Sequence, residues 1–259
     1  MRGLGGEGGR NCSWVTIESC AILLAMAGLG HPSQISEFKM AALHHPQSDT
    51  LWAYAAGTLD EASSVLVASH LALCPECRAD VARMEAMGGE MLEDAGTVSI
   101  SSSLDDIMAR LDGPVFVKAQ SQPIKTPAND TILPRPLRDY VGSSVDTVKW
   151  HGLTSGVEYF DLPVRAKGRR ARLLKIAPGT RVPSHGHGGE EMTMVLAGGY
   201  TDEFGSYARG DVETADVTQV HQPVADAGEP CICLTVTRGA LIPSAIFSVI
   251  NRFFPRLSA

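Results

Sequence analysis

The stretch "GTRVPSHGHGGEEMTMVLAGG", residues 179–199, decides the fold of the carboxyl-terminal half of the chain. His185 and His187 are two positions apart, and side chains two apart on a strand point to the same side of a sheet. The glycines at 188 and 189 predict a turn, after which Glu191 returns on the neighbouring strand. The stretch therefore predicts two adjacent strands that aim two histidines and a carboxylate into one interior.

Other short stretches with alternating apolar residues indicate further strands. They include "ARLLKIAPG", "EMTMVLAGGY" and "CICLTVTRG", and turns rich in Gly, Pro and Asp separate them. Such spacing is typical of an antiparallel sandwich or a small barrel. We therefore expect an antiparallel β domain over residues 136–259.

A third histidine could complete a metal site inside this β domain. His221, in "TQVHQPV", follows the turn "GSYARGD". The spacing of His185, His187 and Glu191 before Gly198 resembles the first motif of the cupin family, and every fixed position of that motif is matched. Cupins usually add a histidine from a second motif, although the Pro-x-Gly that normally precedes it is missing here. The resemblance implies a cupin barrel with these three histidines and Glu191 as metal ligands.

The sequence leaves open which metal binds and which glutamate is its carboxylate ligand. Three histidines and a carboxylate suit zinc, iron, manganese or nickel. Glu190 is the alternative carboxylate, although its spacing fits the motif less well. Cys231 and Cys233 place two thiols on one strand face, where they are either small apolar fillers or oxidation-sensitive groups close to the metal.

The amino-terminal half is predicted to be helical. From residue 47 to about 92 the apolar residues recur at helical spacing. Asp60 is expected to cap one helix, and Pro75 fits the first turn of the next. Ser103 and Asp106, three positions apart, predict the start of a further short helix. Prolines interleaved with polar residues over 113–135 predict a linker. The chain is thus expected to hold a small helical domain (40–112) and a β domain (136–259), each with a core of its own.

A second group of metal-binding residue types lies in the helical half, in "ASHLALCPECRAD", residues 68–80. Cys74 and Cys77 share one face at the start of a helix, where free amides and the helix dipole favour thiolates. His70 would reach the same ion from the end of the preceding helix, and the pair His44 and His45 can supply a fourth ligand to a tetrahedral zinc. A domain of this size commonly needs a structural metal. The alternative is that the cysteines are small core residues.

The segment from His44 to Asp94 resembles the zinc-binding anti-sigma domain of ChrR-type proteins, whose signature is a histidine followed at a distance by HxxxCxxC. The resemblance continues through the linker and the β domain. It implies that His45, His70, Cys74 and Cys77 hold zinc, with His44 as the near competitor of His45. It also implies a second zinc in the cupin domain.

The same resemblance implies a regulator and not an enzyme. ChrR-type proteins bind a sigma factor of the extracytoplasmic-function type and release it in response to reactive oxygen, singlet oxygen especially. The expected contacts are apolar residues of the helical domain, with that domain's own core as the alternative use for them. These residues are Val65, Leu66, Val81, Met84 and Met91.

An enzyme is the alternative function: a metal-dependent cupin dioxygenase or isomerase with a helical appendage. This reading explains the ligands in the β domain but leaves those of the helical half without a purpose. Sequence leaves open whether the barrel also forms a homo-oligomer.

Composition limits the kinds of partner and the cellular compartment that we expect for the chain. The net charge of −7 argues against direct nucleic-acid binding, which needs clustered Lys and Arg. The one basic cluster, residues 165–170, is expected to be a solvated turn between strands. Six cysteines, most in close pairs near histidines, suit the reducing cytoplasm. The longest early apolar run, residues 21–30, is too short to cross a bilayer. We expect residues 1–39 to be disordered and Met40 to be the true start of the chain.

Overall fold

The computed structural model describes residues 42–99, 103–111, 132–166 and 168–243. All of these described residues belong to one compact unit. The expectations for residues 1–39, for Met40 and for most of the 113–135 linker lie outside the described residues. Among the described residues, no helix is long and apolar enough to cross a membrane.

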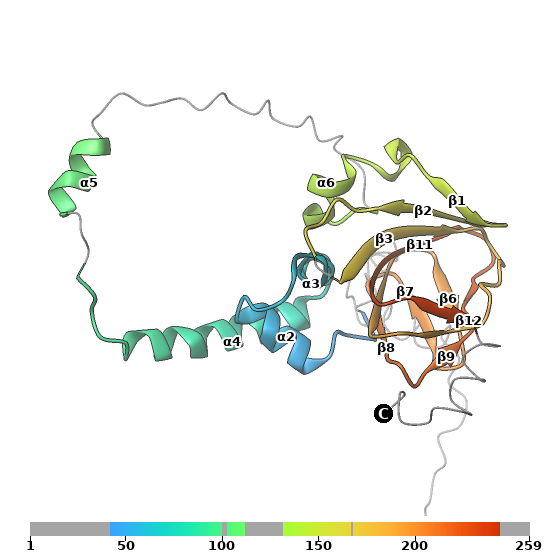
Figure 1. Cartoon of the computed structure of the whole chain (residues 1–259), viewed down its shortest axis with the longest axis horizontal. Coiled ribbons are helices and arrows are strands. Elements are labelled where there is room, and N and C mark those ends of the chain that lie inside the picture. The colour runs from blue at the N-terminus through green and yellow to red at the C-terminus, as the bar shows by residue number, and fades with distance from the viewer. Residues whose placement is uncertain (1–41, 100–102, 112–131, 167, 244–259) are drawn as a thin grey trace, which may run out of the picture. The chain divides into compact units, whose positions relative to one another are not determined.

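The first part of the described chain is helical (Figure 1). Its α-helices are α2 (Ser48–Ala55), α3 (Glu61–Leu73), α4 (Pro75–Glu93), α5 (Leu104–Leu111) and α6 (Arg135–Val141), and a 3₁₀ helix, η2, spans Val145–Thr147.

The expected helix starts are confirmed. The Asp60 side chain accepts a hydrogen bond from the Ser63 amide at the start of α3, and Pro75 occupies the first turn of α4. Ser103 and Asp106 bond to each other's backbone amides at the start of α5. These local rules of helix capping act through neighbours in sequence, which is why the sequence could show them.

The second part is an antiparallel β structure, as predicted. Its strands are β1 (His151–Thr154), β2 (Val157–Asp161), β3 (Arg169–Ile176), β4 (His185–His187), β5 (Glu191–Ala197), β6 (Gly199–Thr201), β7 (Ser206–Ala208), β8 (Val212–Ala215), β9 (Val220–His221), β10 (Val224–Ala225), β11 (Cys231–Arg238) and β12 (Leu241–Pro243). The largest sheet has the order β1-β2-β3-β11-β5-β8, and two three-stranded sheets have the orders β10-β6-β7 and β12-β4-β9.

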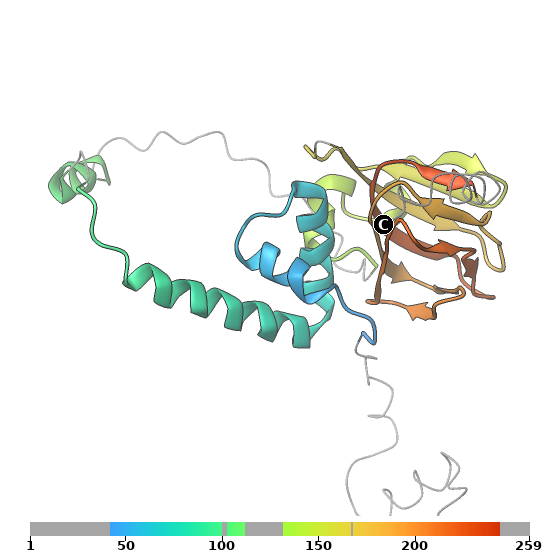
Figure 2. The same cartoon turned by 60° about the horizontal axis from the view of Figure 1, so that its bottom comes forward.

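Helices α3 and α6 cover one face of the large sheet (Figure 1; Figure 2). Leu66 of α3 and Leu137 of α6 share a buried cluster with Leu173, Met194 and Leu234 of the strands. The next residue of α3, Val67, belongs instead to a cluster with the helical cysteines. Helix α3 is therefore apolar on more than one side because it is buried on more than one side. The helical part and the β part share α3, and this differs from the expectation of two separate cores.

Two smaller features also differ from the expectations. Leu133 lies in the segment 113–135, which the prolines predicted to be a linker. It is instead buried in the cluster that contains Leu66, Leu137 and the strand residues. In the basic cluster, Arg169 is not in a solvated turn: its Nε lies 2.9 Å from Asp60 Oδ2, and its Nη1 lies 3.4 Å from Glu190 Oε1. Arg169 thus ties the capping residue of α3 to strands β3 and β5.

We predict that Leu66→Ala lowers the free energy of unfolding by about 2–5 kcal/mol, because Leu66 is fully buried between α3 and the sheet. Met91→Ala, at a residue with 76% of its surface exposed, should change it by less than about 0.5 kcal/mol. Urea unfolding of the full chain measures both. Equal losses for the two variants would contradict this burial.

Two candidate metal centres

The first candidate centre, here called the helical centre, consists of His45, His70, Cys74 and Cys77. His45 precedes α2, His70 is in the last turn of α3, Cys74 separates α3 from α4, and Cys77 is in the first turn of α4. One ligand atom of each residue lies within 4.8 Å of the others, and all but the half-buried His45 are buried. The fold therefore brings together the four residues that the sequence nominated.

The distances in the helical centre suit a tetrahedral ion. His45 Nδ1 lies 3.5 Å from Cys74 Sγ and 3.3 Å from Cys77 Sγ. A nitrogen and a sulfur that bind one zinc tetrahedrally are about 3.6 Å apart, given the usual bond lengths. The donor set and its spacing therefore fit zinc.

The tautomer of His70 also fits a ligand. Its Nδ1 lies 2.8 Å from the Gly210 carbonyl oxygen, and because a carbonyl only accepts, Nδ1 carries the proton. Nε2 then keeps its lone pair, and this buried atom has no hydrogen-bond partner among the described residues. Burial lowers the pKa of His70, which keeps the imidazole neutral. A metal ion at Nε2 would satisfy the orphaned atom.

The Cys77 thiol needs a nearby cation in order to ionise. Burial, together with the adjacent Cys74, raises the pKa of Cys77 to about 12. The Cys77 amide donates to Cys74 Sγ at the start of α4, which partly offsets the cost of a thiolate there. Without an ion the Cys77 thiol would stay protonated, so binding of a metal there must release a proton.

The structure distinguishes His45 from His44, the other candidate for the fourth ligand of the helical centre. His44 Nδ1 lies 3.4 Å from Asp211 Oδ2, and the His44 ring lies 4.7 Å from the Tyr207 ring. His44 therefore faces the β part while His45 faces the thiols. This placement favours His45 as the fourth ligand.

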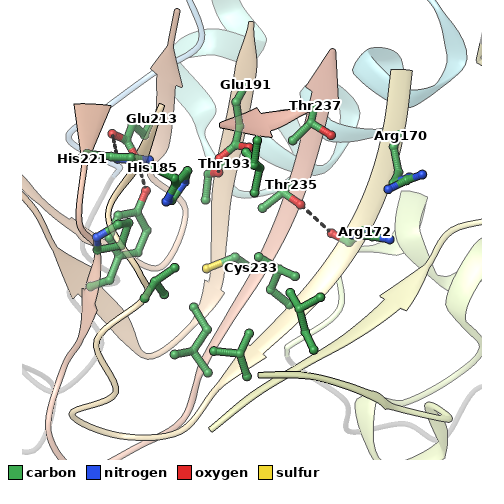
Figure 3. A pocket seen from close by; sticks show the side chains of 18 of the residues that line it. Arg170, Arg172, His185, Glu191, Thr193, Glu213, His221, Cys233, Thr235 and Thr237 are labelled. Carbon is green, nitrogen blue, oxygen red and sulfur yellow. Dashed lines mark hydrogen bonds and ion pairs between the residues drawn. The ribbon is translucent and has the colours of Figure 1, made fainter. Parts of the chain in front are cut away.

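The second candidate centre, here called the barrel centre, consists of His185, His187, Glu191 and His221. His185 and His187 are on β4, Glu191 begins β5, and His221 ends β9, directly opposite His185 in the antiparallel register. All four side chains are buried, and their ligand atoms lie within 4.8 Å of one another. Figure 3 shows three of them, His185, Glu191 and His221, on the strands that line one cavity.

Hydrogen bonds orient two of these histidines toward a common point. His185 Nδ1 donates to the Pro183 carbonyl at 2.8 Å, and His221 Nδ1 lies 2.8 Å from Asp202 Oδ2. The two Nε2 atoms then face each other at 3.2 Å. Two nitrogens bound tetrahedrally to one zinc are about 3.3 Å apart, so this separation fits an ion between them. Both ring nitrogens of His187 are buried without a hydrogen-bond partner among the described residues.

Burial and charge set the protonation of the barrel centre. Burial lowers the pKa of His187 to about 4 and raises that of Glu191 to about 7. Burial also opposes protonation of His221, but the carboxylates of Glu213 and Asp202 outweigh it and raise the pKa to about 9. Glu190, the alternative carboxylate, bonds instead to Arg169, and this favours Glu191 as the ligand.

A cavity of about 300 Å³ adjoins the barrel centre. Polar groups of the centre line one part of it, and apolar side chains such as Leu174, Ile176 and Val182 line another. Cys233 also lines it (Figure 3), and its Sγ lies 3.3 Å from that of Cys231. The barrel centre therefore borders a space that a small molecule can occupy, whereas no residue of the helical centre lines this cavity.

Two functional residues were missed by sequence reasoning. Asp202 and Glu213 both contact His221 Nδ1, at 2.8 and 3.3 Å, and so hold the imidazole in the tautomer a metal requires. Both residues lie in ordinary turn or strand sequence, at spacings that belong to no ligand motif. Only the pairing of the strands brings them to His221.

A helical His and Cys centre next to an antiparallel barrel with a centre of three histidines and a carboxylate defines a protein that joins a zinc-finger module to a cupin-like module. Comparison with known families agrees: residues 48–78 match a zinc-finger family, and residues 139–241 match the ChrR Cupin-like domain.

The chain is 42% identical over 219 residues to the anti-sigma-E factor ChrR of Cereibacter sphaeroides, covering 84% of this chain and 97% of that one. The chain belongs to the ChrR family of anti-sigma factors. A crystal structure of Rhodobacter sphaeroides SigE in complex with the anti-sigma ChrR is also similar, with a TM-score of 0.67 and 42% identity over 76% of this chain and 100% of that chain. These relatives confirm the expectation of a regulator and not an enzyme.

We predict that paired substitutions will identify the ligands. His45→Ala and Glu191→Gln should each remove about one metal equivalent from the purified full chain, because each removes one of four ligands. Their neighbours provide matched controls: His44→Ala and Glu190→Gln should keep both equivalents. Inductively coupled plasma mass spectrometry after desalting measures the content. Loss of metal from a control and not from its partner would reverse the assignment.

Proposed function

We propose that this protein binds a sigma factor of the extracytoplasmic-function type in the cytoplasm, holds zinc at both centres, and releases the sigma factor when reactive oxygen, singlet oxygen in particular, attacks the barrel centre. The observation that supports it most is the presence of both centres in one chain that aligns with nearly the whole length of an anti-sigma-E factor. The similar crystal structure is described as a complex of such an anti-sigma factor with SigE.

Part of the expected binding surface is the protein's own core. Val65, Leu66 and Val81 are buried, and Met84 is partly buried against the cluster around the helical cysteines. Of the five residues expected to contact a partner, only Met91 is largely exposed. The alternative use, internal packing, therefore holds for the others.

The exposed apolar residues lie further along the chain, on the second half of α4 and on α5. Met87, Met91 and Leu92 are exposed on α4, and no residue of α5 is buried. The apolar residues of α5 recur at positions i, i+3, i+4 and i+7, which puts them on one face: Leu104, Ile107, Met108 and Leu111. An amphipathic helix with an uncovered face suits docking into a groove of another protein. We assign this face to the sigma factor.

The barrel centre is the better candidate for the sensor. Imidazoles and thiols are chemically suited to oxidation, and the cavity gives a small oxidant a route to His185, His221 and Cys233. The four residues of the helical centre, by contrast, are not among those that line this cavity. Damage at the barrel centre would then have to change the stability of the bound state relative to the released one.

We predict that Ile107→Glu weakens sigma-factor binding by roughly tenfold to a hundredfold, because a buried apolar anchor of an interface is commonly worth about 2 kcal/mol or more. Ala109→Glu places the same charge on the opposite face of α5 and should change binding by less than about threefold. Co-expression with the sigma factor followed by titration of the purified partners measures both. Equal weakening by the two variants would argue against this face.

The thiol pair on β11 gives a separate prediction for the sensor. The Sγ atoms of Cys231 and Cys233 are close enough for an oxidant of the reactive-oxygen class to accept two electrons and two protons as the thiols join in a disulfide. Replacing both residues with serine should slow oxidant-induced release of the sigma factor, measured by loss of the complex on size exclusion. An unchanged response would restrict sensing to the metal ligands.

A further inference from the structure

The turn between β7 and β8, residues 209–211, touches the helical centre directly. The Gly210 carbonyl accepts the proton of His70 Nδ1 and so fixes the orientation of a ligand. Gly210 has φ of +99°, and a Cβ at this position would lie 3.6 Å from the Ala42 side chain. Its left-handed backbone suits glycine, whereas the contact with Ala42 would be of ordinary van der Waals length.

The next residue of the turn, Asp211, holds the chain just before His45. Its Oδ1 accepts hydrogen bonds from the amides of Leu43, at 2.6 Å, and His44, at 3.0 Å. Its Oδ2 accepts from the Ala208 amide at 2.8 Å. The Val212 amide donates to the His44 carbonyl at 3.0 Å. The residue that precedes His45 is thus hydrogen-bonded to the β part through its amide and its carbonyl, and its side chain lies 3.4 Å from Asp211.

A row of side chains leads from the same segment to the barrel centre. The Tyr207 ring lies 4.7 Å from the His44 ring and 4.9 Å from the Tyr200 ring. The Tyr200 hydroxyl donates to Glu213 Oε2, and Glu213 Oε1 lies 3.3 Å from His221 Nδ1. Glu213 follows Asp211 by two positions, and its strand β8 pairs with β5, which begins with Glu191. The two centres are therefore joined by contiguous contacts, in which Tyr207, Tyr200 and Glu213 are buried and His44 is partly exposed.

These contacts position ligands of both centres. One ligand of the helical centre, His70, and the residue just before another, His44, are held by groups of the β7–β8 turn. One ligand of the barrel centre, His221, is held by Glu213 on the strand that leaves this turn. Packed side chains of this kind have few alternative arrangements, so a change in the geometry at one end shifts the contacts at the other.

We propose that the β7–β8 turn with Asp211, together with the row formed by His44, Tyr207, Tyr200 and Glu213, couples the two centres, so that loss of the ion from the barrel centre loosens the ion of the helical centre. The inference rests on the metal occupancy proposed above. Such coupling would carry a change at the barrel centre to the helical part, which is proposed to bind the sigma factor. Because binding linkage is reciprocal, loss of the helical ion must weaken barrel binding by the same factor.

Cobalt(II) in the full chain provides a specific measurement. Only the helical centre has thiolate ligands, so the absorption band for charge transfer from thiolate to cobalt reports that centre alone. A chelator competition followed at this band gives the Kd of the helical centre for cobalt. His187→Ala removes one ligand of the barrel centre. The contacts of His187 are with other ligands, such as Glu191 Oε2 at 3.7 Å and the His221 ring at 5.0 Å, so the substitution leaves Asp211, Tyr207 and Glu213 in place.

In the otherwise unchanged chain, His187→Ala should raise this Kd by about tenfold, within the range usual for coupled sites. In the Asp211→Ala background, His187→Ala should change the Kd of the helical centre by less than about twofold. The reason is that the hydrogen bonds from the Leu43 and His44 amides to Asp211 are gone. Tyr207→Leu interrupts the second route and should likewise reduce the effect. Asp161→Ala, which removes only the Arg172 ion pair at 2.7 Å, is the control and should leave the tenfold effect intact.

A Kd that does not respond to His187→Ala in the unchanged chain would overturn the coupling, as would an equal response in the Asp211→Ala, Tyr207→Leu and control backgrounds. If Asp211→Ala fails to fold, as judged by its thermal transition, Tyr207→Leu alone decides. Absence of the charge-transfer band from the unchanged chain would overturn the proposed helical metal centre itself, and the coupling with it. A normal band with an unresponsive Kd would overturn the coupling only.

Discussion

The burial of helix α3 on more than one side is the constraint on which the rest of the structure depends. Leu66 packs on the large sheet with the strand residues, while Val67 and Leu71 pack with the cysteines of the helical centre. His70 is carried by the same helix and reaches the β7–β8 turn. Because one rigid helix contributes to both cores, the helical centre has a defined place on the β part. A separate helical domain on a linker would not have this property.

The two centres differ in the freedom left to the ion. In the helical centre, two thiols and two imidazoles close a tetrahedral set, which suits a structural role. In the barrel centre, the ligands border a cavity, and the surrounding carboxylates Asp202 and Glu213 are committed to orienting His221. The first arrangement stabilises a fold that presents α4 and α5. The second leaves its ligands open to small molecules, as a sensor requires.

Local features of the structure could be predicted from sequence because their causes are local. The cap at Asp60, Pro75 in the first turn of α4 and the mutual bonds of Ser103 and Asp106 involve residues within three positions of each other. The pair His185 and His187 faces one side because a strand alternates with a period of two. His45 was nominated above His44 through a family resemblance, and its geometry then agreed.

Sequence by itself determined the helical and strand segments and the residue types that can hold two ions, since periodicity, capping and ligand spacing are properties of short segments. Tertiary structure alone decided that α3 is shared, that Val65 and Leu66 are core and not partner contacts, and that Leu133 and Arg169 belong to the packed body. It also brought Asp202 and Glu213 to His221, and Asp211 to the backbone just before His45. These roles depend on contacts between residues far apart in the chain, which form only when strands pair and α3 is buried, and no spacing along the sequence encodes them.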